Sequence, residues 1–407
     1  MKVVKSVIIL GVFGLMSGCV HMKKGAEMSF DDDVSFIKKY MDVVVLKDSS
    51  GMGKVCVVPA LQGRVMTSSA VGGKGQGYGW INYKHFEAGQ ITPHINPYGG
   101  EDRFWLGPEG GQFSIFFPKD APFKFDHWAT PKCLDTEPYD VILKSSSSIA
   151  FKKEIKLTNY SGIDMYLKVE REVRVIEPAE TLKDLGLQSD ASVKMVAYQS
   201  RNKITNTGKN AWDKKNGMLS VWILGMYNPS PATTVVIPYN AGPESEMGPV
   251  VNDNYFGKVP ADRLVVKPSA IYFSGDGKCR SKIGLPPRRA KAVLGSYDAV
   301  SQLLTVVQYS KPQGVEDYVN SAWELQKEPF RGDTVNSYND GPNDAGGILG
   351  PFYELESSSP AAALKPSESL THMHKTIHFT GNEEALDKIA RTVLGVGIEE
   401  IKNGLKR

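Results

Sequence analysis

Apolar and polar residues alternate with a period of two in the two segments that most constrain the fold. They are residues 149–157 (IAFKKEIKL) and 165–175 (MYLKVEREVRV). In the first segment Ile149 and Phe151 lie on the apolar parity, while Lys152 lies on the other. Successive side chains of a β-strand point to opposite faces, so the pattern predicts two half-buried strands that each cover a core with one face.

Further strand-like segments extend along most of the chain and are separated by glycine, proline, asparagine and aspartate. Two segments are predicted to be helical: residues 31–41, which begin with aspartates, and Asn382–Leu394, whose apolar residues recur at helical spacing. Many strands, few helices and no βαβ alternation predict an all-β fold, a large antiparallel β-sandwich in one domain with short N-terminal and C-terminal helices. The other predicted strands are residues 42–47, 54–59, 140–145, 218–226, 233–238, 263–273, 302–309, 352–356 and 374–380.

The N-terminus has the layout of a secretory signal peptide. Lys2 and Lys5 precede a short apolar stretch, and small residues lead up to Cys19. This arrangement resembles the lipobox of bacterial lipoproteins, which implies cleavage after residue 18 and acylation of Cys19. Residues 19–34 are then expected to be a lipidated tether, residues 35–395 the β-sandwich domain and residues 396–407 a tail. The residues after Cys19 include no aspartate retention signal, so the resemblance implies export to the outer membrane.

Composition and cysteine spacing exclude several classes of function. A net charge of +3, with basic residues dispersed along the chain, argues against a nucleic-acid partner. No phosphate-binding loop or dinucleotide fingerprint is present, so no cofactor is expected. Cys56 lies in an apolar run and is predicted to be a buried thiol. The sequence permits a Cys133–Cys279 disulfide without establishing it, and the cysteine spacing does not favour zinc.

The densest group of chemically active residues lies in residues 94–117 (HINPYGGEDRFWLGPEGGQFSIFF). Glycines let a ligand approach the backbone, arginine offers a planar fork for oxygen atoms, and tryptophan offers a flat apolar face. Together they suit a sugar, which presents hydroxyl groups at its rim and C–H groups on its faces. The alternative is an irregular surface loop held by internal salt bridges. The candidate substrate-binding residues are Glu101, Asp102, Arg103, Trp105 and Glu109.

A second candidate is the segment 349–366 (LGPFYELESSSPAAALKP), in which Glu354 and Glu356 share strand parity. Two carboxyl groups on one face are candidates for proton transfer, because crowding raises the pKa of one of them. The alternative is a solvent-facing strand with two exposed acids.

Three further polar segments are given weaker functional interpretations. His372, His374 and His378 share a parity that permits metal binding, but a polar strand at the surface is the preferred interpretation, and no metal site is predicted. Residues 333–344 (DTVNSYNDGPND) are rich in oxygen ligands but lack EF-hand spacing, which favours turns over calcium binding. Residues 201–212 (RNKITNTGKNAW) are expected to form a polar loop near a ligand site.

Three runs carry a resemblance to a known group of proteins. They are GGEDRFWLGPEGG, NGMLSVWILGMYNPSP and LGPFYELESSSPAAALKPSESLTH. They resemble an uncharacterised family of bacterial exported proteins that is itself similar to the galactose mutarotase (aldose 1-epimerase) superfamily. The resemblance spans roughly residues 35–395 and implies a β-supersandwich with a sugar cleft.

The resemblance also implies roles for individual residues. Glu356 best matches the general base of the mutarotases, with Glu354 as the second choice. Arg103 would bind hydroxyl groups, and His94 or His127 would be the acid, although the histidine motifs of that superfamily are not visible in this chain.

The sequence therefore predicts a carbohydrate-active exported lipoprotein, with interconversion of sugar anomers as its candidate reaction. Two alternatives stay open. One is a glycan-binding lipoprotein without catalysis, and the other is a glycan-cleaving lyase or hydrolase on the same fold.

Overall fold

The computed structural model describes residues 28–343 and 346–405. The predicted signal peptide and Cys19 lie outside the described residues. Within the described part, no helix is both long enough and apolar enough to cross a membrane.

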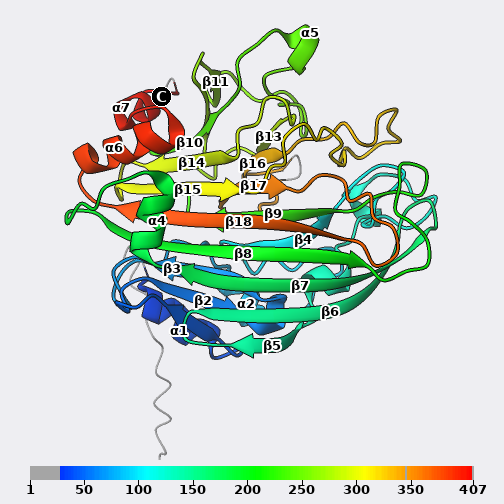
Figure 1. Ribbon diagram of the computed structural model, residues 1–407, viewed down its shortest axis with the longest axis horizontal. Coiled ribbons are helices and arrows are strands. Elements are labelled where there is room, and N and C mark those ends of the chain that lie inside the picture. The colour runs from blue at the N-terminus through cyan, green and yellow to red at the C-terminus, as the bar shows by residue number, and fades with distance from the viewer. Residues whose placement is uncertain (1–27, 344–345, 406–407) are drawn as a thin grey trace, which may run out of the picture.

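Two large antiparallel sheets form the body of the molecule, with the ten-stranded sheet in front of the five-stranded one in Figure 1. Every pairing between named strands is antiparallel, which confirms the predicted β-sandwich. In spatial order the ten-stranded sheet contains β11 (Leu264–Val266), β12 (Ala270–Ser274), β10 (Thr233–Pro238), β14 (Val293–Asp298), β15 (Leu303–Tyr309), β18 (Ser369–Thr380), β8 (Lys194–Asn206), β7 (Asp164–Ile176), β6 (Ser148–Thr158) and β5 (Asp140–Lys144).

The second sheet carries the candidate site and is extended at one edge. Its order is β13 (Ser281–Leu285), β16 (Val335–Asn339), β17 (Tyr353–Ser358), β9 (Ser220–Tyr227) and β4 (Arg103–Gly107). An isolated bridge between Val65 and Asp102, the residue before β4, connects this edge to a small sheet of β1 (Val44–Lys47), β2 (Lys54–Val58) and β3 (Arg64–Ser69).

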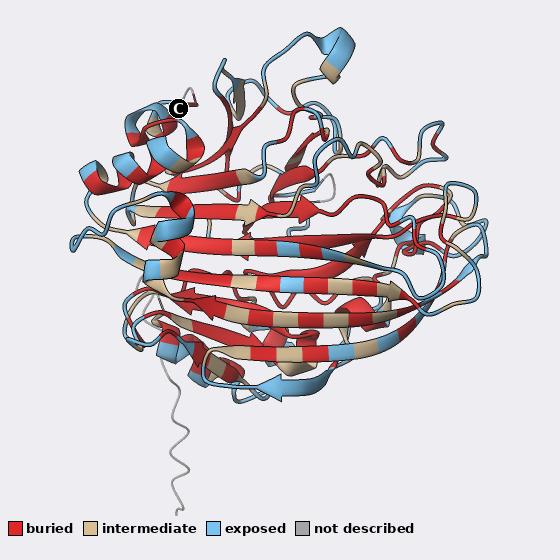
Figure 2. Cartoon of the chain, in the orientation of Figure 1, coloured by how far each residue is buried: buried red, intermediate tan, exposed pale blue. Residues whose placement is uncertain are grey.

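The main core lies between the two large sheets. On β6 and β7 buried residues alternate with more exposed ones, as Figure 2 shows, and this confirms the period-two prediction. Ile149 and Phe151 of the ten-stranded sheet belong to the same apolar cluster as Phe104 and Ile223 of the five-stranded sheet. Burial of these apolar faces is the main force that holds the sheets together.

The core also contains a buried polar network, and it includes the histidines of β18. His378 Nε2 lies 3.0 Å from the Glu101 carboxylate, and the Ser357 hydroxyl lies 2.9 Å from His372 Nε2 and 2.8 Å from His374 Nδ1. All three histidines are fully buried, so the preferred interpretation of a polar strand at the surface is wrong. Their shared parity directs all three side chains between the two large sheets. The strand itself, β18, lies in the interior of the ten-stranded sheet.

Short helices flank the sheets. The first ones are α1 (Phe30–Ile37), η1 (Pro59–Leu61), α2 (Tyr83–Ala88), η2 (Phe125–His127) and α3 (Lys132–Asp135). They are followed by α4 (Pro178–Leu185), α5 (Glu244–Met247), α6 (Glu383–Leu394) and α7 (Ile398–Lys402).

Helix α6 ends at Leu394 as predicted and begins one residue after the predicted start. The Asn382 side chain caps it by accepting from the amide of Ala385, and Gly395 ends it in the left-handed region, with a φ of 74°.

The folded part extends beyond the expected domain bounds at both ends. Phe30 of α1 is fully buried, although it falls within the segment 19–34 that is expected to be a tether. Ile398 and Ile401 of α7 are buried against the ten-stranded sheet, although residues 396–407 are expected to be a tail. Both ends are held because their apolar side chains fill core positions.

Other differences concern the positions and bounds of strands. Residues 201–212, expected to be a polar loop, contain the end of β8. Residues 94–117 and 333–344 contain β4 and β16, and the predicted strand 263–273 is divided into β11 and β12. Cys56 is buried as predicted, and both Cys133 and Cys279 are free thiols rather than disulfide partners.

Candidate functional site

One face of the five-stranded sheet gathers charged and aromatic side chains from all five strands. Residues that lie opposite each other on neighbouring strands share a face of the sheet. Glu356 lies opposite Asn336 on one side and Leu224 on the other, and Leu224 in turn lies opposite Arg103. Alternation along each strand then puts these side chains on one face and leaves the intervening residues for the core. We call this face the site face; it comprises Arg103, Trp105, Trp222, Lys282, Asn336, Tyr338, Glu354 and Glu356.

Glu356 is the best-held carboxylate of the site face. Its side chain is fully buried, and its Oε2 atom accepts from Trp222 Nε1 at 2.8 Å and from Lys282 Nζ at 3.0 Å. Its other oxygen, Oε1, has no hydrogen-bond partner among the described residues. One oxygen is thus fixed by two donors, and the other is free to accept a proton or a hydroxyl group.

Glu354 pairs with a different cation, Arg103, at 3.2 Å. Burial raises the pKa of the Glu354 carboxyl group to about 8, with the Arg103 guanidinium opposing the rise and the Glu356 carboxylate adding to it. Glu354 is therefore largely protonated at neutral pH, and its carboxyl group is able to donate a hydrogen bond.

A third carboxyl group, Glu109, lies just beyond the end of β4. Its backbone N–H donates to the Ser321 hydroxyl at 3.2 Å. Gly110 allows this close approach, because a Cβ atom there would lie 2.2 Å from the Ala322 carbonyl oxygen. The loop after β4 is thereby held against residues 320–326.

Burial raises the pKa of Glu109 to about 7, and the Glu356 carboxylate contributes to the rise. The Lys282 ammonium and the Trp323 and Trp128 side chains oppose it. The indole N–H of Trp128 favours the carboxylate without forming a hydrogen bond of regular geometry with any described group. Glu109 is therefore divided between its protonated and ionised forms near neutral pH, which is the state required of a general acid or base.

Lys282 lies between these acids. Burial alone lowers the pKa of its ammonium group, but the carboxylates of Glu356, Glu109 and Glu354 outweigh burial and raise it. The ammonium nitrogen also lies 4.8 Å from the centre of the Trp222 ring. Lys282 is thus a permanent cation at neutral pH.

Tryptophan rings form one wall of the site. Trp105 packs edge-on against Trp222 with 5.5 Å between ring centres, and the Arg103 guanidinium carbon lies 4.3 Å from the centre of the Trp105 ring. Trp105 Nε1 and Arg103 Nε are buried and have no hydrogen-bond partner among the described residues. These donors lie on the same face of the sheet as Glu356.

A further acid lies at the β13 edge of the site. The Tyr255 hydroxyl donates to the Asp333 carboxylate, and the Asn336 amide donates to the Tyr255 oxygen at 3.0 Å. Gly284 makes room for this group, because a Cβ atom there would lie 2.1 Å from Asp333 Oδ2. Burial raises the pKa of Asp333 to about 6, opposed by its hydrogen bonds from Tyr255 and Asn252 and by Lys282.

The structure separates the candidate substrate-binding residues into two groups. Arg103 and Trp105 lie on the site face, and Glu109 adjoins it. Glu101 and Asp102 instead belong to the core network. The Glu101 carboxylate accepts from the Ser68, Tyr198 and His378 side chains, and the Asp102 carboxylate pairs with Arg171 at 2.6 Å.

The two candidate acid histidines lie outside this constellation. The half-buried His94 donates through Nδ1 to the Trp128 carbonyl oxygen and packs against Phe125, whereas His127 is exposed on η2. Among the described residues no hydrogen bond or ion pair joins either imidazole to Glu354 or Glu356. Both residues therefore lie near Trp128 and are not paired with Glu354 or Glu356.

Sequence reasoning missed Lys282, Trp222 and Tyr255. Lys282 and Trp222 follow from the register of β13 and β9, which the sequence does not reveal. Tyr255 lies in a loop with no motif of its own. Among the described residues, no group of three or more histidine, cysteine or acidic side chains is arranged to hold a metal ion.

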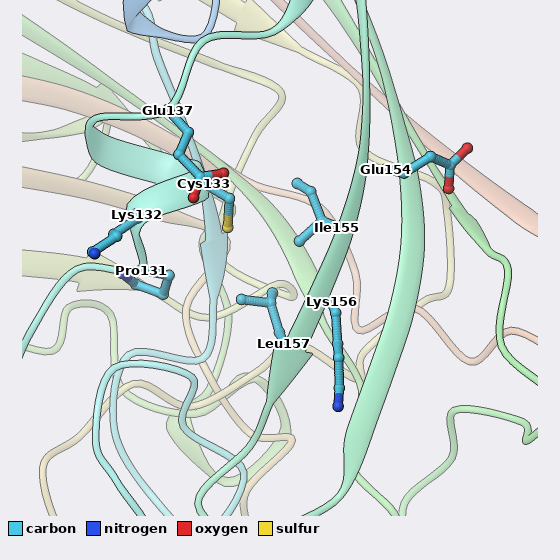
Figure 3. A pocket seen from close by; sticks show the side chains of 8 residues that line it. All are labelled: Pro131, Lys132, Cys133, Glu137, Glu154, Ile155, Lys156 and Leu157. Carbon is cyan, nitrogen blue, oxygen red and sulfur yellow. The ribbon is translucent and has the colours of Figure 1, made fainter.

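Two surface pockets lie elsewhere on the molecule. One, of about 210 Å³, separates α3 from β6; Ile155 and Leu157 point toward α3, while Glu154 points away on the other side of the strand (Figure 3). The other, of about 400 Å³, is lined by residues that include Tyr239 and Leu394. Neither is lined by a residue of the site face. At the rim of the site, Glu109, Lys282, Tyr255 and Trp323 are partly exposed.

Solved structures with a similar course of the chain come from several bacteria. An Escherichia coli K12 protein with a provisional name as an aldose 1-epimerase is 13% identical, with a TM-score of 0.49 over 84% of this chain and 100% of that one. A galactose mutarotase-like protein from Lactobacillus casei is 9% identical, with a TM-score of 0.45 over 83% of this chain and 100% of that one. The Slr1438 protein from Synechocystis is 11% identical, with a TM-score of 0.48 over 84% and 96%.

At these identities and TM-scores the likeness concerns the fold alone and supplies no argument for an activity. No curated protein matches the chain. The family model that matches residues 28–405 is that of DUF6786, a family of unknown function, and the chain belongs to this family.

Proposed function

We propose that this chain is a carbohydrate-active protein that binds a sugar on the site face and moves protons between Glu109 and Glu356. The observation that carries the proposal is the arrangement at Glu356, where one carboxylate oxygen is fixed by Trp222 and Lys282 and the other is free. A carboxylate held in this way is oriented to receive a proton from a bound hydroxyl group.

The composition of the site supports a sugar as the ligand. A sugar ring offers C–H faces that pack on indole rings and hydroxyl groups that bond to charged and polar atoms. Trp105 and Trp222 supply the rings. The free groups Arg103 Nε and Trp105 Nε1 supply donors, and Glu356 Oε1 supplies an acceptor.

The proposed reaction is the interconversion of sugar anomers. Glu356 accepts the proton of the anomeric hydroxyl group while protonated Glu109 donates a proton to the ring oxygen. The bond between the anomeric carbon and the ring oxygen breaks, which gives the open-chain aldehyde. Rotation about the adjacent carbon–carbon bond, followed by the reverse proton transfers, closes the other anomer. Glu109 here takes the role that the family resemblance gives to a histidine, because its pKa of about 7 suits an acid that must later act as a base.

The experiment follows the equilibration of freshly dissolved single anomers of common aldoses by proton NMR. The expected result is acceleration by the wild-type protein, loss of acceleration in Glu356→Gln and retention of sugar binding in that variant. Glu154→Gln, at an exposed glutamate on β6, is the matched control and should keep the wild-type rate. A wild-type rate in Glu356→Gln would remove Glu356 from the mechanism.

The same pair of carboxyl groups supports a second candidate, glycoside cleavage. A protonated acid opposite an ionised carboxylate is the arrangement that glycosidases use, and Glu109 and Glu356 meet that description through the raised pKa of Glu109 and the ion pair of Glu356. Release of reducing ends from oligosaccharides, without anomer exchange of free sugars, would favour this candidate. Saturable sugar binding without any turnover would instead favour a glycan-binding protein.

We also propose export and acylation at Cys19, on the basis of the N-terminal residues alone. The test is metabolic labelling with an alkyne fatty acid in cells that express the full chain. Labelling of the wild type and its loss in Cys19→Ser are expected. Equal labelling of both proteins would contradict the proposed anchor.

A further inference from the structure

Lys282 contacts one acid of the site directly and interacts electrostatically with the others. Its Nζ atom lies 3.0 Å from Glu356 Oε2, 4.8 Å from the centre of the Trp222 ring and 5.6 Å from the centre of the Tyr255 ring. The lysine side chain is only 11% exposed. Its stem and head group are therefore held in one place by β17, β9 and the loop that carries Tyr255.

The groups that face Lys282 come from every element around it. Glu356 and Glu354 lie on β17, Glu109 follows β4, and Asp333 precedes β16. The Tyr255 ring also faces Lys282. The other site cation, Arg103, is on the far edge of the sheet and pairs with Glu354. Lys282 is consequently the cation that acts on all four acids.

We propose that Lys282 is a positioning residue of the site, which fixes the Glu356 carboxylate against Trp222 and sets the charge balance of Glu109, Glu354 and Asp333. This inference takes from the proposed function only that the site face is a binding site. The contacts of Lys282 do not depend on which reaction takes place there. A lysine is suited to this role because its compact ammonium group acts as a point charge on several neighbours, whereas arginine directs a planar fork at one of them.

Removal of the charge should disturb all the neighbouring acids together. Lys282 opposes the rise in the pKa of Glu109, Glu354 and Asp333, so removal of its charge should raise each of these pKa values further. Lys282→Met keeps the apolar stem against the Trp222 and Tyr255 rings and removes the charge. Lys282→Arg keeps the charge.

The test is a titration of the wild-type protein and its variants, labelled with ¹³C at the glutamate carboxyl groups, followed by NMR without any ligand. Glu109→Gln and Glu354→Gln identify the two resonances. The titration midpoints of Glu109 and Glu354 are expected to rise by about one unit or more in Lys282→Met and to return toward the wild type in Lys282→Arg. Lys375→Met is the matched control, since Lys375 is similarly buried at 13% exposure and pairs with Asp184 at 2.9 Å on the other sheet.

Unchanged midpoints in folded Lys282→Met would overturn the inference. If Lys282→Met and Lys282→Gln both fail to fold while Lys282→Arg folds, the lysine serves stability and the inference is again overturned. If the wild-type protein does not catalyse the proposed reaction, the titration result still stands. The failure of the proposed function and the failure of this inference are therefore distinguishable.

Discussion

Glu354 and Glu356 share one face of β17, yet their carboxyl groups pair with cations from opposite edges of the five-stranded sheet. Arg103 comes from β4 at one edge and Lys282 from β13 at the other. The central strand thus carries two acids in two different environments. Such a difference is how a protein gives neighbouring carboxyl groups separate roles.

The Arg103–Glu354 pair should be important for stability, because both side chains are at least 93% buried. Arg103→Met leaves Glu354 without its cation, and we expect a loss of about 1–3 kcal/mol in the free energy of unfolding. The loss is moderated because Glu354, with its pKa raised to about 8, is already largely protonated at neutral pH. Urea unfolding at pH 7 measures the change.

The double variant Arg103→Met with Glu354→Gln should recover part of this loss, since the unpaired acid is then absent. Arg174→Met is the control, because the Arg174–Glu180 pair is about 40% exposed and such surface pairs contribute about 0–1 kcal/mol. Equal losses at the two sites would show that the buried pair stabilises the protein no more than the exposed pair does.

The fluorescence of the site tryptophans should report the ionisation of Glu109. Its carboxyl group faces Trp128 and Trp323, and its pKa of about 7 places the change of charge near neutral pH. We expect an emission change with a midpoint near pH 7 that disappears in Glu109→Gln. His94→Gln is the matched control, because His94 contacts the Trp128 carbonyl group and Phe125 without touching Glu109. A transition that survives in Glu109→Gln and disappears in His94→Gln would assign the signal to the imidazole.

The sequence predicted the elements with a clear apolar pattern, whether alternating or continuous as in β9 and β10, and missed the half-exposed strand β8. Alternation identified β6 and β7, and the apolar stripe with its caps identified α6 within one residue of its observed start. Strands such as β3 (RVMTSS) and β16 (VNSYN) are buried on both faces and contain polar residues that bond inside the molecule. Their sequences therefore lack the pattern that marks a strand.

The candidate site was predictable only where a signal is local. Strand parity put Glu354 and Glu356 on one face, and the density of residues 94–117 pointed to Arg103 and Trp105. The meeting of these segments with Lys282 depends on the order β13-β16-β17-β9-β4, which joins strands far apart in sequence. The same limit explains why the sequence placed Glu101 and Asp102 with Arg103, although their side chains enter the core.

Asp33 should make the protein less stable as pH rises. The side chain is buried in α1, and burial raises its pKa to about 7, opposed by the hydrogen bond from Tyr83. The folded state therefore binds its proton more tightly than the unfolded state, whose reference value is 3.8. The stabilisation is complete below pH 3.8 and is lost as pH rises to about 7.

Asp33→Asn removes this dependence and keeps an acceptor for the Tyr83 hydroxyl group. We expect the variant to be more stable than the wild type at pH 8, by on the order of 2–4 kcal/mol, and to have no advantage at pH 3. Thermal unfolding at the two pH values is the measurement. An equal shift at both values would mean that the substitution acts through packing and that the proton plays no part.

The buried histidines of β18 should have the opposite effect and weaken the fold in acid. Burial lowers the pKa of His372 to about 3 and that of His374 to about 4, from a reference value of 6.5. Below pH 6.5 the unfolded chain therefore binds protons that the folded chain does not bind. The stability contributed by each neutral ring is complete above pH 6.5 and is lost as pH falls toward 4. The contribution is on the order of 3 kcal/mol for each ring.

His374→Gln tests this effect, because the amide can still bond to the Ser357 hydroxyl that lies 2.8 Å from His374 Nδ1. The free energy of unfolding should fall less steeply between pH 6.5 and pH 4.5 in the variant, by about 1.4 kcal/mol per pH unit for one linked proton. At pH 8 the ring is neutral in both states, so any difference there measures packing and serves as the control. A variant with the wild-type slope would show that His374 is protonated in the folded protein, in which case the Ser357 hydroxyl could only accept from it.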